Sequence, residues 1–363
     1  VKAATPGYEH VPAVILQGHM DMVCEKAPDC TKNMDTEGLD LAVEGDTIYA
    51  VGTTLGGDDG IAVAMALAIL DAKNLEHPRV EAVFTVDEEI GMLGAAGLDV
   101  SMLQGRRLLN LDSEAEGIFT VSCAGGNVTE CTIPLTRAPY EGTILTVTVG
   151  GLAGGHSGIE IHKGLGNSNL LMGRVLYAAA QRTELRLVEI SGGLKDNAIP
   201  RETVAIVAAA DAETVKTVCR EMDAVLKQEY RVTDPDVSVT VQTGGSGVPM
   251  DAETTNRVLC LLTCLPNGVQ AMSADIPGLV QTSLNLGVLY TTETELYSGS
   301  CVRSSVETQK QMLVDRIRCL AQMLRGTAKV CGDYTAWAYR QDSPLRDLLA
   351  EVFTEQYGHA PKI

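Results

Sequence analysis

The fold is decided by Ala13-Val14-Ile15-Leu16-Gln17-Gly18-His19-Met20-Asp21, a stretch near the start of the chain. Its four apolar residues have the length of a short buried β-strand, and an imidazole and a carboxylate follow directly. Two later apolar runs have the same form, because Val80–Val86 leads into Asp87-Glu88-Glu89 and Leu108–Leu111 leads into Asp112. The sequence therefore predicts three strands that each carry polar, chemically active side chains at the carboxyl end.

A helix is predicted between the first two of these strands. Ile61–Leu70 is an Ala-rich apolar segment, and the turn Gly56-Gly57-Asp58-Asp59-Gly60 precedes it. Strands that alternate with helices favour an α/β fold with much parallel pairing. In such open sheets, ligands bind outside the carboxyl ends of the strands. The side chains expected to converge in one crevice are His19, Asp21, Asp58, Glu88, Glu89 and Asp112.

The second half of the chain has a different order of elements. From about Gly125 the pattern predicts β-α-β-β-α-β order, first over 143–241 and then, in similar form, over 252–331. We expect an α/β domain with a mostly parallel central sheet, formed by residues 1–124 and 337–363. Residues 125–336 are expected to form an inserted α+β domain of two such units.

Length and composition limit the class of protein. The 363 residues favour two domains, and 45% hydrophobic with 21% charged residues is typical of a globular chain. No apolar run is long enough to span a bilayer. The net charge of −19 disfavours nucleic acid and anionic membranes as partners, although solubility alone also explains an acidic surface.

The ten cysteines show no CxxC pair and no regular spacing. A disulfide framework or a cysteine zinc site would need such a spacing. Free, reduced cysteines in a large chain indicate a cytoplasmic protein.

The polar residues at the ends of the predicted elements suit divalent metal ions. Zinc takes imidazole and carboxylate ligands, and two ions about 3.5–4 Å apart need a bridging anion because they repel each other. Asp58 could instead cap the following helix, and Glu88 with Glu89 could be a solvated strand end. Asp112 could begin a turn, and His19 could be a hydrogen-bonded core histidine. Each of these structural roles explains one residue by itself. They do not explain why all of these residues occur together at the ends of the predicted elements.

Four motifs carry a resemblance to a known family. They are Gln17-Gly18-His19-Met20-Asp21-Met22-Val23, Gly56-Gly57-Asp58-Asp59-Gly60-Ile61, Asp87-Glu88-Glu89-Ile90-Gly91 and Asn110-Leu111-Asp112-Ser113-Glu114. In order and spacing they resemble the metallopeptidase family of aminoacyl-histidine dipeptidases, also called Xaa-His dipeptidases, peptidase D or β-alanyl-histidine dipeptidases, in the wider M20 clan. The resemblance implies a di-zinc dipeptidase that hydrolyses short unblocked dipeptides such as β-alanyl-histidine.

The resemblance also implies which residues bind metal. His19 and Asp112 would hold one zinc ion, and Glu89 would hold the other. Asp58 would bridge the two ions, and a cis peptide bond would follow it, between Asp58 and Asp59. Mn²⁺ or Co²⁺ would also suit such a mixed nitrogen and oxygen site.

Two further residues would act beside the metal ligands. Asp21 would lie behind His19, orient its ring and raise its basicity. Glu88 would be the general base, taking a proton from the metal-bridging water and passing it to the leaving amine.

The resemblance makes the inserted domain a lid that mediates homodimers. Its segment Gly154-Gly155-His156-Ser157-Gly158 resembles the family's GGHSG, in which His156 would stabilise the oxyanion. Asn197 matches a substrate-binding asparagine, and Arg303 would clamp the C-terminal carboxylate of the substrate. A structural hydrogen-bonding role remains the alternative for Asn197 and Arg303, and an ordinary loop histidine remains the alternative for His156.

One departure from the family concerns the last zinc ligand, a histidine in a C-terminal His-Ala-Gly-Leu-Glu-like segment. The chain ends at Gly358-His359-Ala360-Pro361-Lys362-Ile363, which resembles the stretch before that segment. We therefore expect the chain to be truncated at both ends. Two alternative functions stay open: an M20-type deacylase of N-acyl amino acids, and a metal-binding relative without catalysis.

Overall fold

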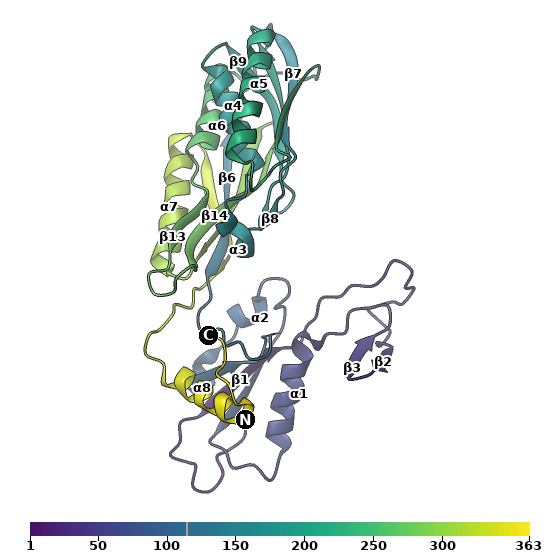
Figure 1. Cartoon of the computed structure of the whole chain (residues 1–363), viewed down its shortest axis with the longest axis vertical. Coiled ribbons are helices and arrows are strands. Elements are labelled where there is room, and N and C mark those ends of the chain that lie inside the picture. Colours follow the sequence, from purple (N-terminus) through teal and green to yellow (C-terminus); the bar gives the residue numbers. More distant parts are fainter. Residues whose placement is uncertain (114) are drawn as a thin grey trace. The chain divides into compact units, whose positions relative to one another are not determined.

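The computed structural model describes residues 1–113 and 115–363, and its contacts divide the chain into two compact units (Figure 1). Unit 1 consists of Val1–Val121 and Arg340–Ile363, and unit 2 consists of Ser122–Tyr339. The boundaries expected from the sequence, 124/125 and 336/337, each differ from this division by three residues.

Unit 1 is built on a small parallel sheet. Its strand order is β4-β1-β5, with β1 (Val14–His19) between β4 (Val80–Thr85) and β5 (Arg107–Asn110). Both pairings are parallel, so the three strands end at the same edge of the sheet. The polar residues that follow each strand are therefore carried to one side of unit 1.

Helix α1 (Gly57–Asp71) packs against this sheet. Its Ala66 lies in the buried centre of unit 1 together with Leu16 of β1 and Val80 of β4. The alanines of α1 present short side chains, which lets the helix lie close to the strands. The helix expected over Ile61–Leu70 is confirmed, and the residues assigned before it include a non-helical backbone at Asp58 and Asp59.

The remaining elements of unit 1 lie outside the sheet. The C-terminal helix α8 (Pro344–Tyr357) carries Phe353, whose ring meets Phe119 edge-on at a centroid distance of 5.7 Å. A bridge between Ile118 and Lys362 holds the end of the chain to the same unit. The other elements are a hairpin of β2 (Leu41–Glu44) and β3 (Thr47–Ala50), the short helix α2 (Leu93–Ala96) and the 3-10 turn Val100–Met102.

Unit 2 contains one large sheet in which every pairing is antiparallel. The strand order is β12-β7-β11-β9-β14-β15-β6-β16, and β13 pairs with β14 outside this path. Its strands are β6 (Gly125–Pro134), β7 (Thr143–Gly150), β9 (Leu185–Gly192), β11 (Thr203–Ala209), β12 (Ser238–Thr243), β13 (Gly268–Met272), β14 (Val280–Thr291), β15 (Glu295–Ser304) and β16 (Thr327–Tyr334).

Long helices pack on this sheet and enclose the main hydrophobic core (Figure 1). They are α4 (Ser168–Ala180), α5 (Ala212–Glu229), α6 (Ala252–Cys264) and α7 (Glu307–Met323). Helix α5 begins where the Asp211 carboxylate accepts hydrogen bonds from the N–H groups of Glu213 and Thr214. The predicted class, an α/β part with a parallel sheet and an α+β part, is confirmed. Within the described residues, no helix is long and apolar enough to cross a bilayer.

One predicted strand is divided in the structure. The sequence predicts a single strand over 198–209, but β10 (Ala198–Ile199) ends before Pro200 and β11 begins only at Thr203. Proline has no N–H group to donate to a sheet, so the ladder is interrupted there. β10 pairs instead with β8 (Gly155–His156), which joins a short helical segment, α3 (Ser157–Glu160), and the 3-10 turn Ile161–Lys163.

A buried carboxylate fixes the turn that leads into β5. Glu81 of β4 is 1% exposed and accepts hydrogen bonds from the backbone N–H groups of Gln104 and Gly105 at 3.0 and 2.9 Å. Arg79 Nε donates to the same carboxylate at 2.9 Å. The hydrogen bond from Gly105, with those from Arg79 and Gln104, holds the pKa of Glu81 below its usual range although burial opposes this. Ionised Glu81 therefore ties the start of β5 to β4.

We expect Glu81→Gln to weaken this tie by about 1–3 kcal/mol, because the amide N–H group would face backbone donors. Faster hydrogen exchange over residues 103–110 at neutral pH would measure the loss, with Glu44→Gln at an exposed site on β2 as control. Because the folded-state pKa is lowered, the effect is complete above the ordinary pKa of about 4.3 and is lost as the pH falls through the lowered value. Unchanged exchange at neutral pH would contradict this role.

Candidate metal centre

His19 lies among carboxylates at the carboxyl edge of the unit 1 sheet. Its side chain is 1% exposed, and its Nε2 atom lies 3.0 Å from Asp58 Oδ1 and 3.6 Å from Asp112 Oδ1. Its Nδ1 atom lies 3.4 Å from Asp21 Oδ1, and both of these buried atoms lack a hydrogen-bond partner. The imidazole therefore faces acidic groups from both of its nitrogens.

Helix α1 reaches this group because β1 has no side chain at Gly18. A Cβ atom at Gly18 would lie 2.5 Å from Asp59 Oδ2 and 2.7 Å from Ala62 Cβ. In the space that Gly18 leaves, the buried Asp59 carboxylate accepts a hydrogen bond from the backbone N–H of His19 at 3.2 Å. The peptide bond between Asp58 and Asp59 is cis, as the resemblance implies.

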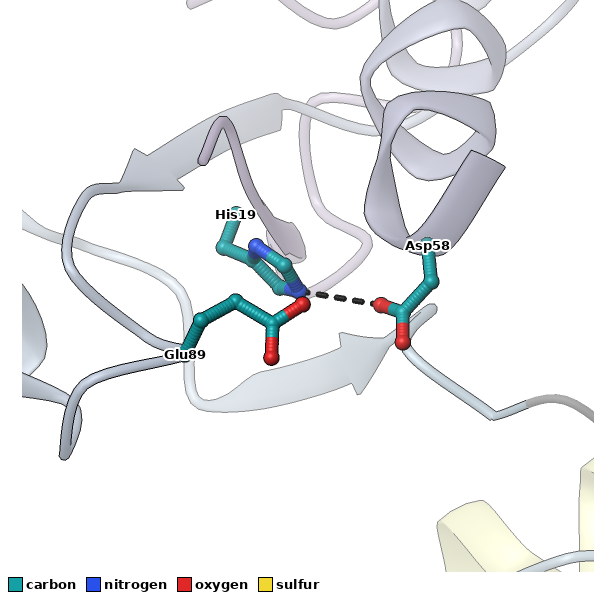
Figure 2. A group of neighbouring side chains, drawn as sticks. All are labelled: His19, Asp58 and Glu89. Carbon is teal, nitrogen blue, oxygen red and sulfur yellow. Dashed lines mark hydrogen bonds and ion pairs between the residues drawn. The ribbon is translucent and has the colours of Figure 1, made fainter. Parts of the chain in front are cut away.

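Two structural explanations of these residues do not fit the geometry. Gly56 is the N-cap of α1 and has no side chain to cap the helix, and the backbone at Asp58 and Asp59 is not helical. Asp58 therefore does not cap the helix, and its carboxylate points at the ring of His19 (Figure 2). His19 is not an ordinary core histidine either, because its near neighbours are carboxylates.

The chain turns sharply after β4 and brings two glutamates to the same edge. Asp87 has a φ of 56°, in the left-handed region that few residues other than glycine adopt. After this turn, the backbone N–H of Glu89 donates to Asp21 Oδ2 at 3.1 Å. Glu89 thereby lies beside His19 (Figure 2), and Glu88 precedes it at a half-buried position.

Two sets of ligand atoms in unit 1 are close enough to hold a metal ion. One set is His19, Asp58 and Glu89, and the other is His19, Asp59 and Asp112. Within each set the ligand atoms lie within 4.8 Å of one another. The four residues that the resemblance implies as ligands are thus all present, and Asp59 joins them.

The surroundings of His19 are strongly acidic. Burial, together with the carboxylates of Asp59 and Asp58, raises the pKa of Asp112 to about 7, although His19 acts in the opposite direction. Burial also raises the pKa of Glu88, to which nearby carboxylates contribute. Among residues 1–113 and 115–363, no lysine or arginine forms a salt bridge with any of these acids.

The residues present fit a divalent metal. Carboxylates of like charge that lie together and partly buried either take up protons or need a cation to stay ionised, and no lysine or arginine of the described residues forms a salt bridge with them. One imidazole with several carboxylates is a nitrogen and oxygen donor set that zinc and similar metals take. Because Nδ1 of His19 faces Asp21 at 3.4 Å, Nε2 is the nitrogen turned towards Asp58 and Asp112, where an ion would bind.

The three residues expected to contact substrate lie together in unit 2. The backbone N–H of Ser157 donates to the carbonyl of Asn197 at 2.8 Å, which joins the two segments. A Cβ atom at Gly158 would lie 2.9 Å from His156 Cε1 and 3.3 Å from Arg303 Cζ. The side chains of His156 and Arg303 therefore approach each other over Gly158.

Sequence reasoning assigned no role to three side chains of these two groups: Asp59, Ser157 and Tyr334. The sequence did mark Asp59 as a candidate, because it follows a second aspartate just before a helix. Only the backbone geometry shows which of the two carboxylates faces which partner. Ser157 Oγ is buried without a partner, as is Arg303 Nε. Tyr334, whose hydroxyl accepts from Arg303 Nη1 at 3.0 Å, gave no local signal.

Comparison with known sequences identifies relatives over the whole chain. A model of peptidase family M20/M25/M40 matches residues 15–363. The cytosol non-specific dipeptidase of Escherichia coli (strain K12) is 35% identical over 367 residues, covering 100% of this chain and 76% of that protein. An uncharacterized Bacillus subtilis protein, YqjE, is 29% identical over 185 residues, covering 47% of this chain and 44% of its own length.

A solved structure agrees with the fold. The crystal structure of aminoacylhistidine dipeptidase from Vibrio alginolyticus is similar with a TM-score of 0.92 and 36% sequence identity. The similarity covers 100% of this chain and 75% of that one. The resemblance read from the four motifs is confirmed, and the chain belongs to peptidase family M20/M25/M40.

Proposed function

We propose that this chain is a zinc-dependent dipeptidase that hydrolyses short unblocked dipeptides, with Xaa-His dipeptides such as β-alanyl-histidine as preferred substrates. The observation that carries the proposal is the buried His19 surrounded by carboxylates at the carboxyl edge of a parallel sheet. Membership of a peptidase family makes peptide-bond hydrolysis the reaction class. Two relatives that each cover 100% of the chain bear the name dipeptidase.

Four side chains would hold two zinc ions. His19 and Asp112 would bind one ion, Glu89 would bind the other, and Asp58 would lie between them. Their ligand atoms fall in the two close sets described above. When bound, metal ions at such a site polarise the scissile carbonyl and lower the pKa of water. Zinc suits these ligands, and Mn²⁺ or Co²⁺ are the alternatives.

Glu88 would be the general base. It would accept a proton from the attacking water on its carboxylate and deliver that proton to the leaving amine nitrogen. Burial raises the pKa of Glu88, which moves this carboxyl towards the range where it both accepts and donates a proton near neutral pH. Asp21, held by the N–H of Glu89, would orient the His19 ring from its Nδ1 side.

Unit 2 would supply the contacts to the substrate. His156 would donate to the carbonyl oxygen as negative charge develops there. Asn197 would hydrogen-bond the substrate, and Arg303 would bind its C-terminal carboxylate through two parallel N–H donors. The approach of His156 and Arg303 over Gly158, and the hydrogen bond from the Ser157 N–H to the carbonyl of Asn197, support these roles.

The remaining assignments follow from the resemblance. Residues 1–124 and 337–363 would be the catalytic zinc-binding domain, and residues 125–336 would be a lid that also forms a homodimer. The protein would be cytoplasmic, as the name of the Escherichia coli relative suggests for that protein. Sedimentation of the purified chain would measure the oligomeric state directly.

Two other functions use the same metal centre. An M20-type deacylase would remove the acyl group of an N-acyl amino acid, and a relative without catalysis would bind metal only. In both substrate classes the scissile amide bond joins an acyl group to an amino acid. A dipeptide carries a free amino group on the acyl side of that bond, and an N-acyl amino acid does not.

We expect Gly18→Ala to weaken zinc binding at least about tenfold without removing a ligand, because the added methyl group meets Asp59 Oδ2 and Ala62. Gly60→Ala is the matched control, because a Cβ atom at Gly60 of α1 meets nothing within 4 Å. Competition with a chelator would give both affinities. Equal affinities for the two variants would show that the close approach of α1 does not matter for the metal.

Substitutions of the two neighbouring glutamates should have different effects on kcat and on metal content. Glu88→Gln should lower kcat by about 10²–10⁴ while the metal content stays the same, because only proton transfer is lost. Glu89→Gln should lose bound metal, because it removes a ligand. Elemental analysis and steady-state kinetics on both variants would test this, and a loss of metal in Glu88→Gln would contradict the separation of roles.

The substrate class is tested by a panel of β-alanyl-histidine, other unblocked dipeptides and N-acyl amino acids. The zinc-loaded chain should hydrolyse the dipeptides, lose activity with a chelator and regain it with added zinc. Turnover of N-acyl amino acids alone would favour the deacylase. Stoichiometric metal with no turnover of any member would favour the non-catalytic relative.

A further inference from the structure

One hydrogen bond in unit 2 joins two strands across a third. Arg303 lies on β15 and Tyr334 at the end of β16, and both are paired with Gly126 of β6, the strand between them. Arg303 Nη1 donates to the Tyr334 hydroxyl at 3.0 Å. Neighbouring strands lie about 4.8 Å apart, so the two side chains together bridge about 10 Å of sheet.

Gly126 provides the space for this contact. A Cβ atom there would lie 2.7 Å from the Tyr334 hydroxyl oxygen and 2.9 Å from Cζ. The φ of Gly126 is not in the left-handed region, so its conformational freedom is not what the position requires. The absent side chain is the requirement, because any larger residue would displace the phenol ring from Arg303.

The backbone at Tyr334 is held firmly. The buried ammonium group of Lys310, on α7, donates to the carbonyl of Tyr334 at 2.7 Å and lies 3.0 Å from the carboxylate of Asp333. Asn127, next to Gly126, donates to the same carboxylate at 3.0 Å. A helix and the neighbouring strand thus fix the end of β16, which leaves the phenol little freedom to move.

The hydrogen bond selects one orientation of the guanidinium group. Tyr334 engages Nη1, and Nε is buried away from solvent. The terminal nitrogens are therefore the donors that can meet a carboxylate, and Tyr334 fixes the position of one of them.

We propose that Tyr334 is a positioning residue that holds the terminal nitrogens of Arg303 towards the C-terminal carboxylate of the substrate. This inference rests on the proposed function, in which Arg303 binds that carboxylate. It adds a residue 31 positions away in sequence, on a different strand, that acts only through Arg303.

The test compares Tyr334→Phe with Tyr297→Phe in the full, zinc-loaded chain. The control tyrosine lies on β15, and its hydroxyl bonds Glu130 at 3.1 Å. With β-alanyl-histidine, Tyr334→Phe should raise KM about tenfold and change kcat less than about twofold, whereas Tyr297→Phe should change neither. With β-alanyl-histidinamide, which lacks the carboxylate, Tyr334→Phe should match the parent chain.

A second pair of variants shows whether the effect passes through Arg303. Arg303→Met should raise KM more than Tyr334→Phe does, and adding Tyr334→Phe to Arg303→Met should have no further effect. Gly126→Ala should reproduce the carboxylate-specific rise in KM, and near-ultraviolet circular dichroism would confirm that it is folded.

The outcomes separate the two ideas. An unchanged KM in Tyr334→Phe, an equal rise with the amide substrate, or an additive effect in the double variant would overturn the positioning role. An unchanged KM in Arg303→Met would show that Arg303 does not bind the substrate carboxylate, and it would refute this proposal as well. Failure of the parent chain to hydrolyse any dipeptide would instead refute the proposed function.

Discussion

The centre in unit 1 depends on the close approach of a helix to the end of a strand. Because Gly18 has no side chain, the start of α1 lies against β1, and Asp59 accepts from the backbone N–H of His19. The residue before it, Asp58, points its carboxylate at the imidazole. The other carboxylates lie at the site for a simpler reason, because they follow parallel strands that end at the same edge of the sheet.

That difference explains how much of the site could be predicted from the sequence. Residues that follow buried parallel strands converge by a general rule, so the pattern of apolar runs is enough to bring His19, Glu89 and Asp112 to one edge. The resemblance supplied their roles. Asp59 could not be placed, because two identical neighbours differ only in backbone geometry, and that geometry depends on Gly18, about 40 residues earlier in the chain.

In unit 2 most elements could be predicted, whereas their contacts could not. Local periodicity shows most of the strands and helices, but it missed β6 and β13, and it joined β10 and β11 across Pro200. The contact between Arg303 and Tyr334 depends on two strand registers and on a glycine between them. Register is set by pairing between distant segments, so a single sequence carries no local sign of it.

The acidic cluster also makes the folding stability of unit 1 sensitive to a bound divalent ion. Carboxylates that repel one another oppose folding, and a divalent ion that binds only the folded form offsets this by mass action, about 2.7 kcal/mol at a hundredfold excess over its Kd. The core of unit 1 centres on few buried residues, whereas that of unit 2 is extensive. The proposed metal centre would therefore link the stability of unit 1 to the supply of free metal, so that metal scarcity would lower the amount of folded protein as well as its activity.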